Sequence, residues 1–175
     1  MTEAVDPLGI YSDGLLPQKN ASRAKPRQPY TTLRNLCSKR QIVDTNVLIR
    51  FFTGEPSHLA ARAWHLVDRA DRGEMVLVVL PVIVAETVYT LESFYEIERK
   101  EVASKLLAFL ESRGIEAAEP LRVTDALKRC RDMRAHFADA YLAATALDQG
   151  EPIASFDRDF DKFRDVVRIE PPESE

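Results

Sequence analysis

Short runs rich in β-branched residues alternate with longer stretches of helical periodicity along most of the chain. This alternation is typical of an α/β domain, in which helices connect the strands of a parallel sheet. We therefore expect an α/β domain with a parallel sheet. The expected strands cover residues 41–44, 75–80, 115–117 and 152–155. The expected helices cover residues 46–53, 57–72, 82–94, 98–112, 121–133 and 137–149.

The first 40 residues differ in composition from the rest of the chain. They carry four of the ten prolines and a basic stretch, without a sustained period of 2 or 3.6. We expect residues 1–40 to be a disordered extension, which could also serve as a basic arm for RNA or a partner. Residues 41–170 should form one domain, because 175 residues with 45% hydrophobic content can bury one sizeable core but not two.

Charge and cysteine content narrow the choice of compartment and partner. The net charge of −4 argues against a broad basic face for nucleic acid, although a cation bound between carboxylates would reverse the local field. Cys37 and Cys130 have no zinc or redox spacing, and neither has partners that would make it a nucleophile. No apolar run approaches the roughly 20 residues that span a bilayer. We expect a soluble, cytoplasmic protein without membrane contact.

Four carboxylates stand out because each lies beside an apolar run. Asp44 and Asp157 each follow the point where an expected strand stops. Glu86 lies one turn into the helix after the second expected strand, and Asp139 opens the last long helix. An ionised carboxylate among Ile, Val and Phe loses several kcal/mol of hydration unless a cation or dense hydrogen bonding replaces it. We therefore expect each of these carboxylates to bind a cation or to accept several hydrogen bonds.

One shared metal site would supply such a cation for all four acids. Ligands of parallel sheets bind beyond the carboxyl ends of the strands, and helix N-termini favour anions, so we expect the acids to converge. Mg²⁺ and Mn²⁺ prefer oxygen ligands and commonly act on phosphate substrates. Asp44 alone could cap a helix, and Glu86 could face a helix dipole. Asp139 could face solvent and Asp157 could belong to an acidic turn. Their joint occurrence favours a metal-dependent nuclease.

Other side chains are weaker candidates. His136 precedes Asp139 by one helical turn and could contact phosphate or carry a proton, although a structural role is the ordinary expectation. An aromatic segment, residues 88–95, could supply a dimer face or enter the core. Basic side chains on the expected helices could contact phosphate, although most such side chains are solvated charge. These are Arg50, Arg62, Lys128, Arg129, Arg131 and Arg134.

The order of the acidic motifs resembles a known family. The motifs are residues 42–48 (IVDTNVL), 85–86 (AE), 137–144 (FADAYLAA) and 155–160 (SFDRDF). Together they resemble a PIN-domain ribonuclease of the VapC toxin type, over about residues 41–170. The four motifs in this order are much more specific than any one of them.

The resemblance implies a fold and a function. The fold would be a three-layer α/β/α sandwich with a central, mostly parallel sheet. The activity would be Mg²⁺- or Mn²⁺-dependent endonuclease cleavage of RNA, with a preference for single strands, by a growth-inhibiting toxin. The partners would be the RNA substrate, a cognate antitoxin protein and a second copy of the chain in a homodimer.

The resemblance also implies a role for each acid. Asp44 and Asp139 would be the principal metal ligands, and Glu86 would complete the site. Asp157, or Asp159 in its place, would hold a second metal or its water, and the choice between one and two metals stays open. Three polar residues would orient the acids through hydrogen bonds: Thr45, Asn46 and Ser155.

In the mechanism that we expect, a metal-activated water attacks the phosphodiester, and no residue becomes covalently bound. Two other interpretations stay open. The chain could be a PIN nuclease of RNA processing or DNA metabolism that has no antitoxin. It could also be a non-catalytic module that binds metal or RNA.

Overall fold

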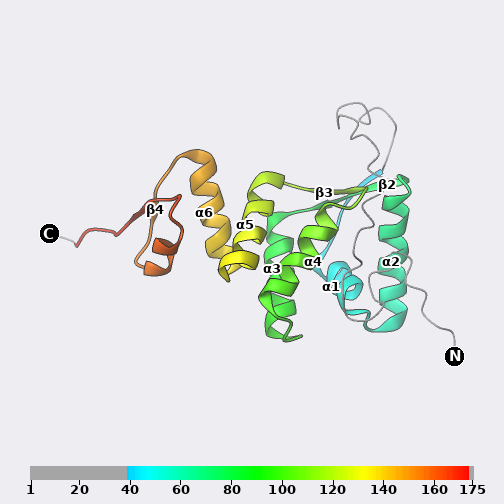
Figure 1. Cartoon of the computed structure of the whole chain (residues 1–175). Coiled ribbons are helices and arrows are strands. Elements are labelled where there is room, and N and C mark those ends of the chain that lie inside the picture. Colours follow the sequence, from blue (N-terminus) through cyan, green and yellow to red (C-terminus); the bar gives the residue numbers. More distant parts are fainter. Residues whose placement is uncertain (1–38, 174–175) are drawn as a thin grey trace, which may run out of the picture.

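The structure is a computed structural model, and it describes residues 39–173 (Figure 1). The helices are α1 (Thr45–Thr53), α2 (Ser57–Asp71), α3 (Pro81–Ser93), α4 (Arg99–Leu110), α5 (Pro120–Met133), α6 (Phe137–Gln149) and the 3-10 helix η1 (Arg158–Lys162). The strands are β1 (Lys39–Ile42), β2 (Met75–Val79), β3 (Ile115–Ala117), β4 (Ile153–Ala154) and β5 (Arg168–Ile169). The expectation of disorder falls on residues that lie outside the described ones, except that Lys39 and Arg40 already belong to β1.

Strands β1, β2 and β3 form a parallel sheet in that order. The register places Ile42 opposite Val78, and Val79 opposite Ala117. The central strand β2 alternates fully buried and half-buried residues, as a strand with helices on both faces requires. The predicted α/β/α fold with a parallel sheet is confirmed.

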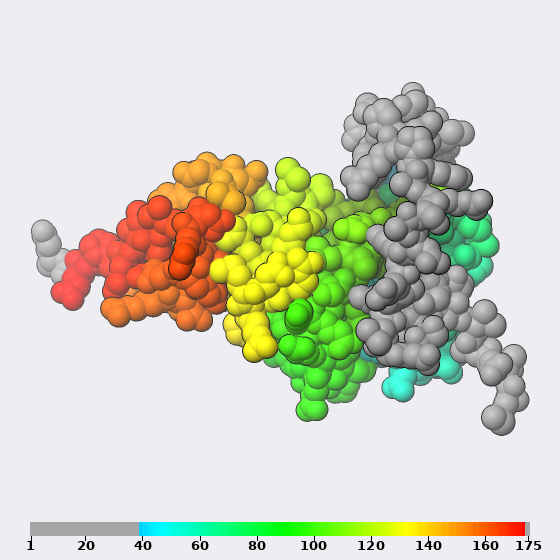
Figure 2. Space-filling view, viewed as in Figure 1, coloured from blue at the N-terminus to red at the C-terminus, as the bar shows by residue number. Residues whose placement is uncertain are grey.

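The fourth expected strand forms but does not join this sheet. Strand β4 pairs in parallel with β5, which the sequence did not predict, and the two make a separate sheet. Figure 1 shows β4 and α6 at one end of the molecule, with α1 and α2 at the other. We call residues 39–117 the sheet half, and residues 137–173 the C-terminal unit. Figure 2 shows the C-terminal unit, orange to red, as a lobe joined to the rest through the yellow helix α5.

Two glycines follow helices for different physical reasons. Gly150 has a φ of +69° and ends α6 by donating its N–H to the Ala146 carbonyl, as expected of a C-terminal cap. Gly114 has a φ of +75°, and a Cβ there would lie 2.1 Å from the Ala70 carbonyl oxygen. Only glycine therefore allows the chain to pass α2 and enter β3.

The core of the sheet half is aromatic. Phe51 and Phe52 on α1 meet Phe109 on α4, with ring centroids 5.3 and 5.6 Å apart, respectively. Burial of each such ring stabilises the fold by roughly 1.5–3 kcal/mol. The buried apolar cluster continues through α5 to Phe137 and Phe163 in the C-terminal unit.

The C-terminal unit is attached to α5 by a buried cation. Arg129 on α5 is only 7% exposed, donates to Asp125 and Asp165, and lies over the Phe163 ring at 5.3 Å from its centroid. These bonds raise the pKa of Arg129 and hold the pKa of Asp165 below its usual value.

None of the helices within residues 39–173 has the length and apolar character needed to cross a membrane.

Candidate functional site

Asp44 lies at the junction between β1 and α1. Its extended backbone ends the strand, and its carboxylate caps the helix by accepting the Asn46 backbone N–H at 3.3 Å and the Asn46 side-chain amide at 3.2 Å. The carboxylate remains exposed. Asp44 thus acts as a helix cap and is also available to a ligand, so the two interpretations of this residue do not exclude each other.

Glu86 comes from α3 and reaches the same corner of the sheet half. The buried Thr45 hydroxyl donates to its Oε2 at 2.6 Å. Because Thr45 directly follows Asp44, this bond ties the carboxylate of α3 to the carboxyl end of β1. We call Asp44 and Glu86 the sheet-half acids, and Thr45 is the residue that links them.

Asp139 lies in the first turn of α6, half-buried, where the helix dipole favours a carboxylate. His136, at the N-cap of α6, contacts Arg99, whose Nη2 lies 2.9 Å from its Nδ1. Arg99 also donates to Glu92 and, at 2.6 Å, to the Arg134 carbonyl. His136 therefore braces the joint between α5 and α6, which favours the structural reading of this residue.

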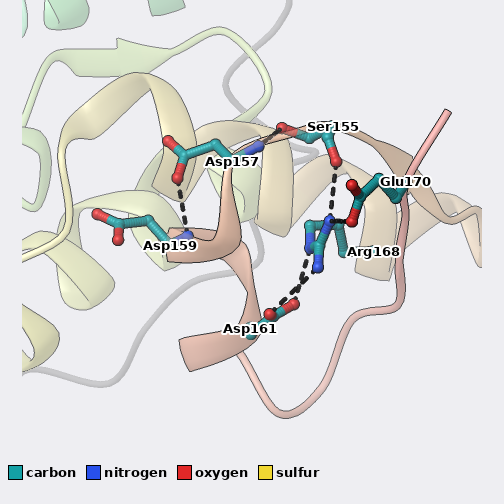
Figure 3. Close-up of polar contacts among 6 residues, drawn as sticks. All are labelled: Ser155, Asp157, Asp159, Asp161, Arg168 and Glu170. Carbon is teal, nitrogen blue, oxygen red and sulfur yellow. Dashed lines mark hydrogen bonds and ion pairs between the residues drawn. The ribbon is translucent and has the colours of Figure 1, made fainter.

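Asp157 lies three residues after Ala154, the last residue of β4, and caps the N-terminus of η1 (Figure 3). Its N–H donates to Ser155 Oγ at 3.0 Å, and its Oδ1 accepts the Asp159 N–H at 2.8 Å. Within residues 39–173, no lysine or arginine pairs with Asp157. Asp159 instead approaches Lys162 at 3.7 Å, and Asp161 binds Arg168 at 2.8 Å, which holds the pKa of Asp161 below its usual value. These pairings favour Asp157 over Asp159 as the fourth acid.

The four acids do not meet within one chain. Among the residues that the structure describes, no group of three or more Asp, Glu, His or Cys side chains lies close enough to hold a metal ion. Our expectation that the carboxyl ends of β1 and β4 would converge is therefore wrong for the single chain. The reason is that α6 packs along α5 and carries β4 into a separate sheet, away from β1.

Some of the basic side chains that could contact phosphate already bind other groups of the chain, and others are exposed. Arg129 is buried in its ion-pair cluster, so it is excluded from this role. Arg131 pairs with Asp132, and Arg50 donates to the Glu55 carbonyl and the Tyr95 hydroxyl. Arg134 is exposed and lies 4.0 Å from Glu98, and Arg62 and Lys128 are also exposed.

Cys130 is fully buried, and this burial raises the pKa of its thiol to about 12, with a further contribution from Glu92. The thiol is therefore protonated at neutral pH and is not a nucleophile.

The residue that sequence reasoning missed is Arg99, which connects α3, α4 and the start of α6. Its partners are 7 to 37 residues away, so no local spacing could reveal them.

A family model for the PIN domain matches residues 42–166. The match covers more than half of the chain, so the chain belongs to the PIN-domain family. The matched range includes both the sheet half and the C-terminal unit, which means that all four acids belong to one family domain. The chain matches no curated protein.

Membership in this family supports a nuclease-type, hydrolytic function, because PIN domains are typically metal-dependent nucleases. The donor chemistry of this chain fits a divalent metal of the kind that PIN domains generally use. The four acids supply carboxylate oxygens, the ligands that hard cations select. Among residues 39–173, however, the acids do not form a group of three or more that could hold a metal ion.

Proposed function

We propose that the protein is an RNA endonuclease that depends on Mg²⁺ or Mn²⁺ and prefers single strands. In this proposal it is a cytoplasmic, growth-inhibiting toxin that is held inactive by a cognate antitoxin. The observation that carries the nuclease proposal is the braced corner of Asp44, Thr45 and Glu86 at the end of β1, within the PIN-domain match.

The residues that would hold the metal are Asp44, Asp139 and Asp157, with Glu86 completing the site. When bound, the metal would supply Lewis-acid chemistry that activates a water and offsets phosphate charge. Phosphate is itself an anion, so an acidic site without a cation would repel the substrate.

The chain's own residues position the carboxylates. Thr45 donates to one oxygen of Glu86, which fixes the direction of the other. Asn46 fixes one oxygen of Asp44 with two hydrogen bonds. Ser155 accepts the N–H of Asp157 and sets the turn from which that carboxylate projects. These hydrogen bonds reduce the reorganisation needed when substrate binds.

The reaction is a hydrolysis in which the water oxygen forms a bond to phosphorus while the bond from phosphorus to the 3'-oxygen breaks. The proton of the water is transferred away, and the departing 3'-oxygen gains one. The RNA 2'-hydroxyl takes no part. The products therefore carry a 5'-phosphate and a 3'-hydroxyl, and fragments with 2',3'-cyclic phosphate ends would contradict this mechanism.

The test is cleavage of a total RNA pool by the purified full chain, freed of any bound partner and supplied with Mg²⁺ or Mn²⁺. Cleavage should disappear in EDTA and in Asp44→Asn and Asp139→Asn. Asp132→Asn, which changes an exposed carboxylate paired with Arg131, should cleave like the wild type. Cleavage of DNA alone would indicate a PIN nuclease of DNA metabolism. A folded, metal-bound protein that cleaves neither RNA nor DNA would indicate a non-catalytic module.

The antitoxin part of the proposal has its own test. A C-terminal tail of the antitoxin that presents an arginine to the acids would compete with the metal. Inhibition by such a protein should therefore weaken as Mn²⁺ is raised. Inhibition that is independent of metal would exclude competition at the acids.

A further inference from the structure

Strand β1 lies at the edge of the sheet that residues 39–173 form. Val43 donates its N–H to the Val78 carbonyl, so this side of the backbone faces β2. Consecutive residues of a strand point their polar groups to opposite sides, so those of Ile42 point away from β2. Within residues 39–173, no other strand pairs with β1. The Ile42 side chain is also 68% exposed, and such an edge is a template for another strand.

Exposed apolar side chains flank Glu86 on the surface of α3. Val82, Glu86 and Tyr89 are spaced by four and three residues on α3, so they form one stripe of the helix surface. All three are exposed, and Tyr89 is 71% exposed. Exposed apolar residues that gather on one stripe of a surface can mark an interaction site.

The C-terminal unit shows the complementary features. Strands β4 and β5 have two residues each, and they form a sheet of their own. Ile153 and Ser155 donate their N–H groups to β5, so the backbone of Ala154 points to the free side of β4. Beside Asp157, Phe156 is 73% exposed. This unit thus also has a free strand edge and an apolar residue next to its acid.

We propose that two copies of this chain exchange their C-terminal units, so that β4 of one copy lies parallel to β1 of the other. Each site then combines Asp44 and Glu86 of one chain with Asp139 and Asp157 of the partner subunit. The exchange covers both free edges, and it brings the carboxyl ends of β1 and β4 together, as a shared acidic site requires. The claim that the composite site cleaves RNA rests on the proposed function.

A second copy is the occupant that the structure favours. The chain's own β4 lies at the far end of the molecule from α1, beyond α5 and α6 (Figure 1). Arg99 braces the joint in this arrangement, with hydrogen bonds to the Arg134 carbonyl and His136. The PIN-domain match also spans both halves, so the two sets of acids belong to one domain that a single chain in this form leaves open.

Complementation between inactive variants tests the exchange. Asp44→Asn and Asp157→Asn chains are co-expressed with different affinity tags, and the mixed dimer is purified through both tags. In an exchanged dimer, one of the two sites regains all four acids, so cleavage should recover to about half of the wild-type rate. The matched control combines Asp44→Asn with Glu86→Gln. Both substitutions lie in the sheet half, so neither site is intact and no cleavage should return.

Two results of this experiment would overturn the exchange. One is that the doubly tagged dimer does not form. The other is that it forms and stays inactive while the wild type cleaves RNA. If the wild type itself does not cleave, the proposed function fails, and a physical test decides the exchange independently.

That physical test is cross-linking with a short bis-maleimide. The full chain carries Cys37→Ser, Ile42→Cys and Ala154→Cys, while the buried Cys130 thiol does not compete. An exchanged dimer should give covalent dimers in denaturing gels, with each single-cysteine variant as the control that does not. Cross-linking within one chain would show that each copy closes on its own β4. A monomeric mass near 19.8 kDa in light scattering, without cross-links, would also overturn the proposal.

Discussion

The sheet half and the C-terminal unit differ in how far ion pairs add to the packing of their apolar residues. In the sheet half, Asp44 ends a strand within a continuous hydrogen-bonded sheet, over a core that includes Phe51, Phe52 and Phe109. In the C-terminal unit, Phe160 and Phe163 are also buried, and ion pairs add to their packing, including that of Arg129 with Asp165 and that of Arg168 with Asp161. Ion pairs respond to pH and salt, and apolar packing depends on them much less. We therefore expect the stability of the C-terminal unit to depend more on pH and salt than that of the sheet half.

The largest loss of stability should follow from a substitution in the core of the sheet half. Phe51 is 2% exposed, and Phe51→Ala should lower the free energy of unfolding by about 4 kcal/mol, because a cavity replaces the ring. Urea denaturation followed by circular dichroism measures this change. The matched control is Phe94→Ala, since Phe94 is 76% exposed and should change stability by less than about 0.5 kcal/mol. Equal losses in both variants would contradict the assignment of the core.

A smaller and more local loss should follow from Arg129→Leu. This change removes hydrogen bonds to two carboxylates, for an expected loss of about 2 kcal/mol. Hydrogen exchange should rise in η1 and β5 and stay unchanged in β1 to β3. Lys128→Leu is the control, because Lys128 is the exposed neighbour on the same helix. Exchange that rises equally in both halves would show that the C-terminal unit is not a separate element.

The Arg129 ion pair should also make the C-terminal unit sensitive to acid. Arg129 holds the pKa of Asp165 below its usual value near 4, so the folded state favours the carboxylate. The resulting stabilisation is fully present above that value and is lost as pH falls through the lower, folded pKa. Urea midpoints of the wild type should therefore exceed those of Asp165→Asn at pH 6 and approach them toward pH 2. A difference that stays constant over this range would exclude the ionised Asp165 as its source.

The smallest structural change should distinguish the two candidates for the fourth acid. Asp159→Asn removes one exposed contact with Lys162, so stability and cleavage should stay near the wild type. Asp157→Asn should lower the cleavage rate about tenfold or more, at similar stability. Rates of RNA cleavage by the two folded variants measure this directly. The opposite order of effects would assign the role to Asp159.

The sequence predicts local structure well because local structure depends on local patterns. Helix α6 spans residues 137–149 as expected, Gly150 ends it, and β4 forms just before Asp157. Strand pairing depends on contacts far apart in the chain, so periodicity cannot reveal that β4 joins β5 instead of β1. For the same reason, the burial of Arg129 and the link from Arg99 to His136 could not be foreseen.

The central claim is that acids from both parts of the molecule act as one metal site, and the affinity for Mn²⁺ tests it most directly. Free Mn²⁺ is measured by electron paramagnetic resonance during titration of the wild type, Asp44→Asn, Asp157→Asn and the control Asp132→Asn. We expect Asp44→Asn and Asp157→Asn each to weaken binding by about tenfold or more, and the control to bind like the wild type. Wild-type affinity in Asp157→Asn, with affinity lost in Asp44→Asn, would show that the sheet half binds metal alone and would contradict the account.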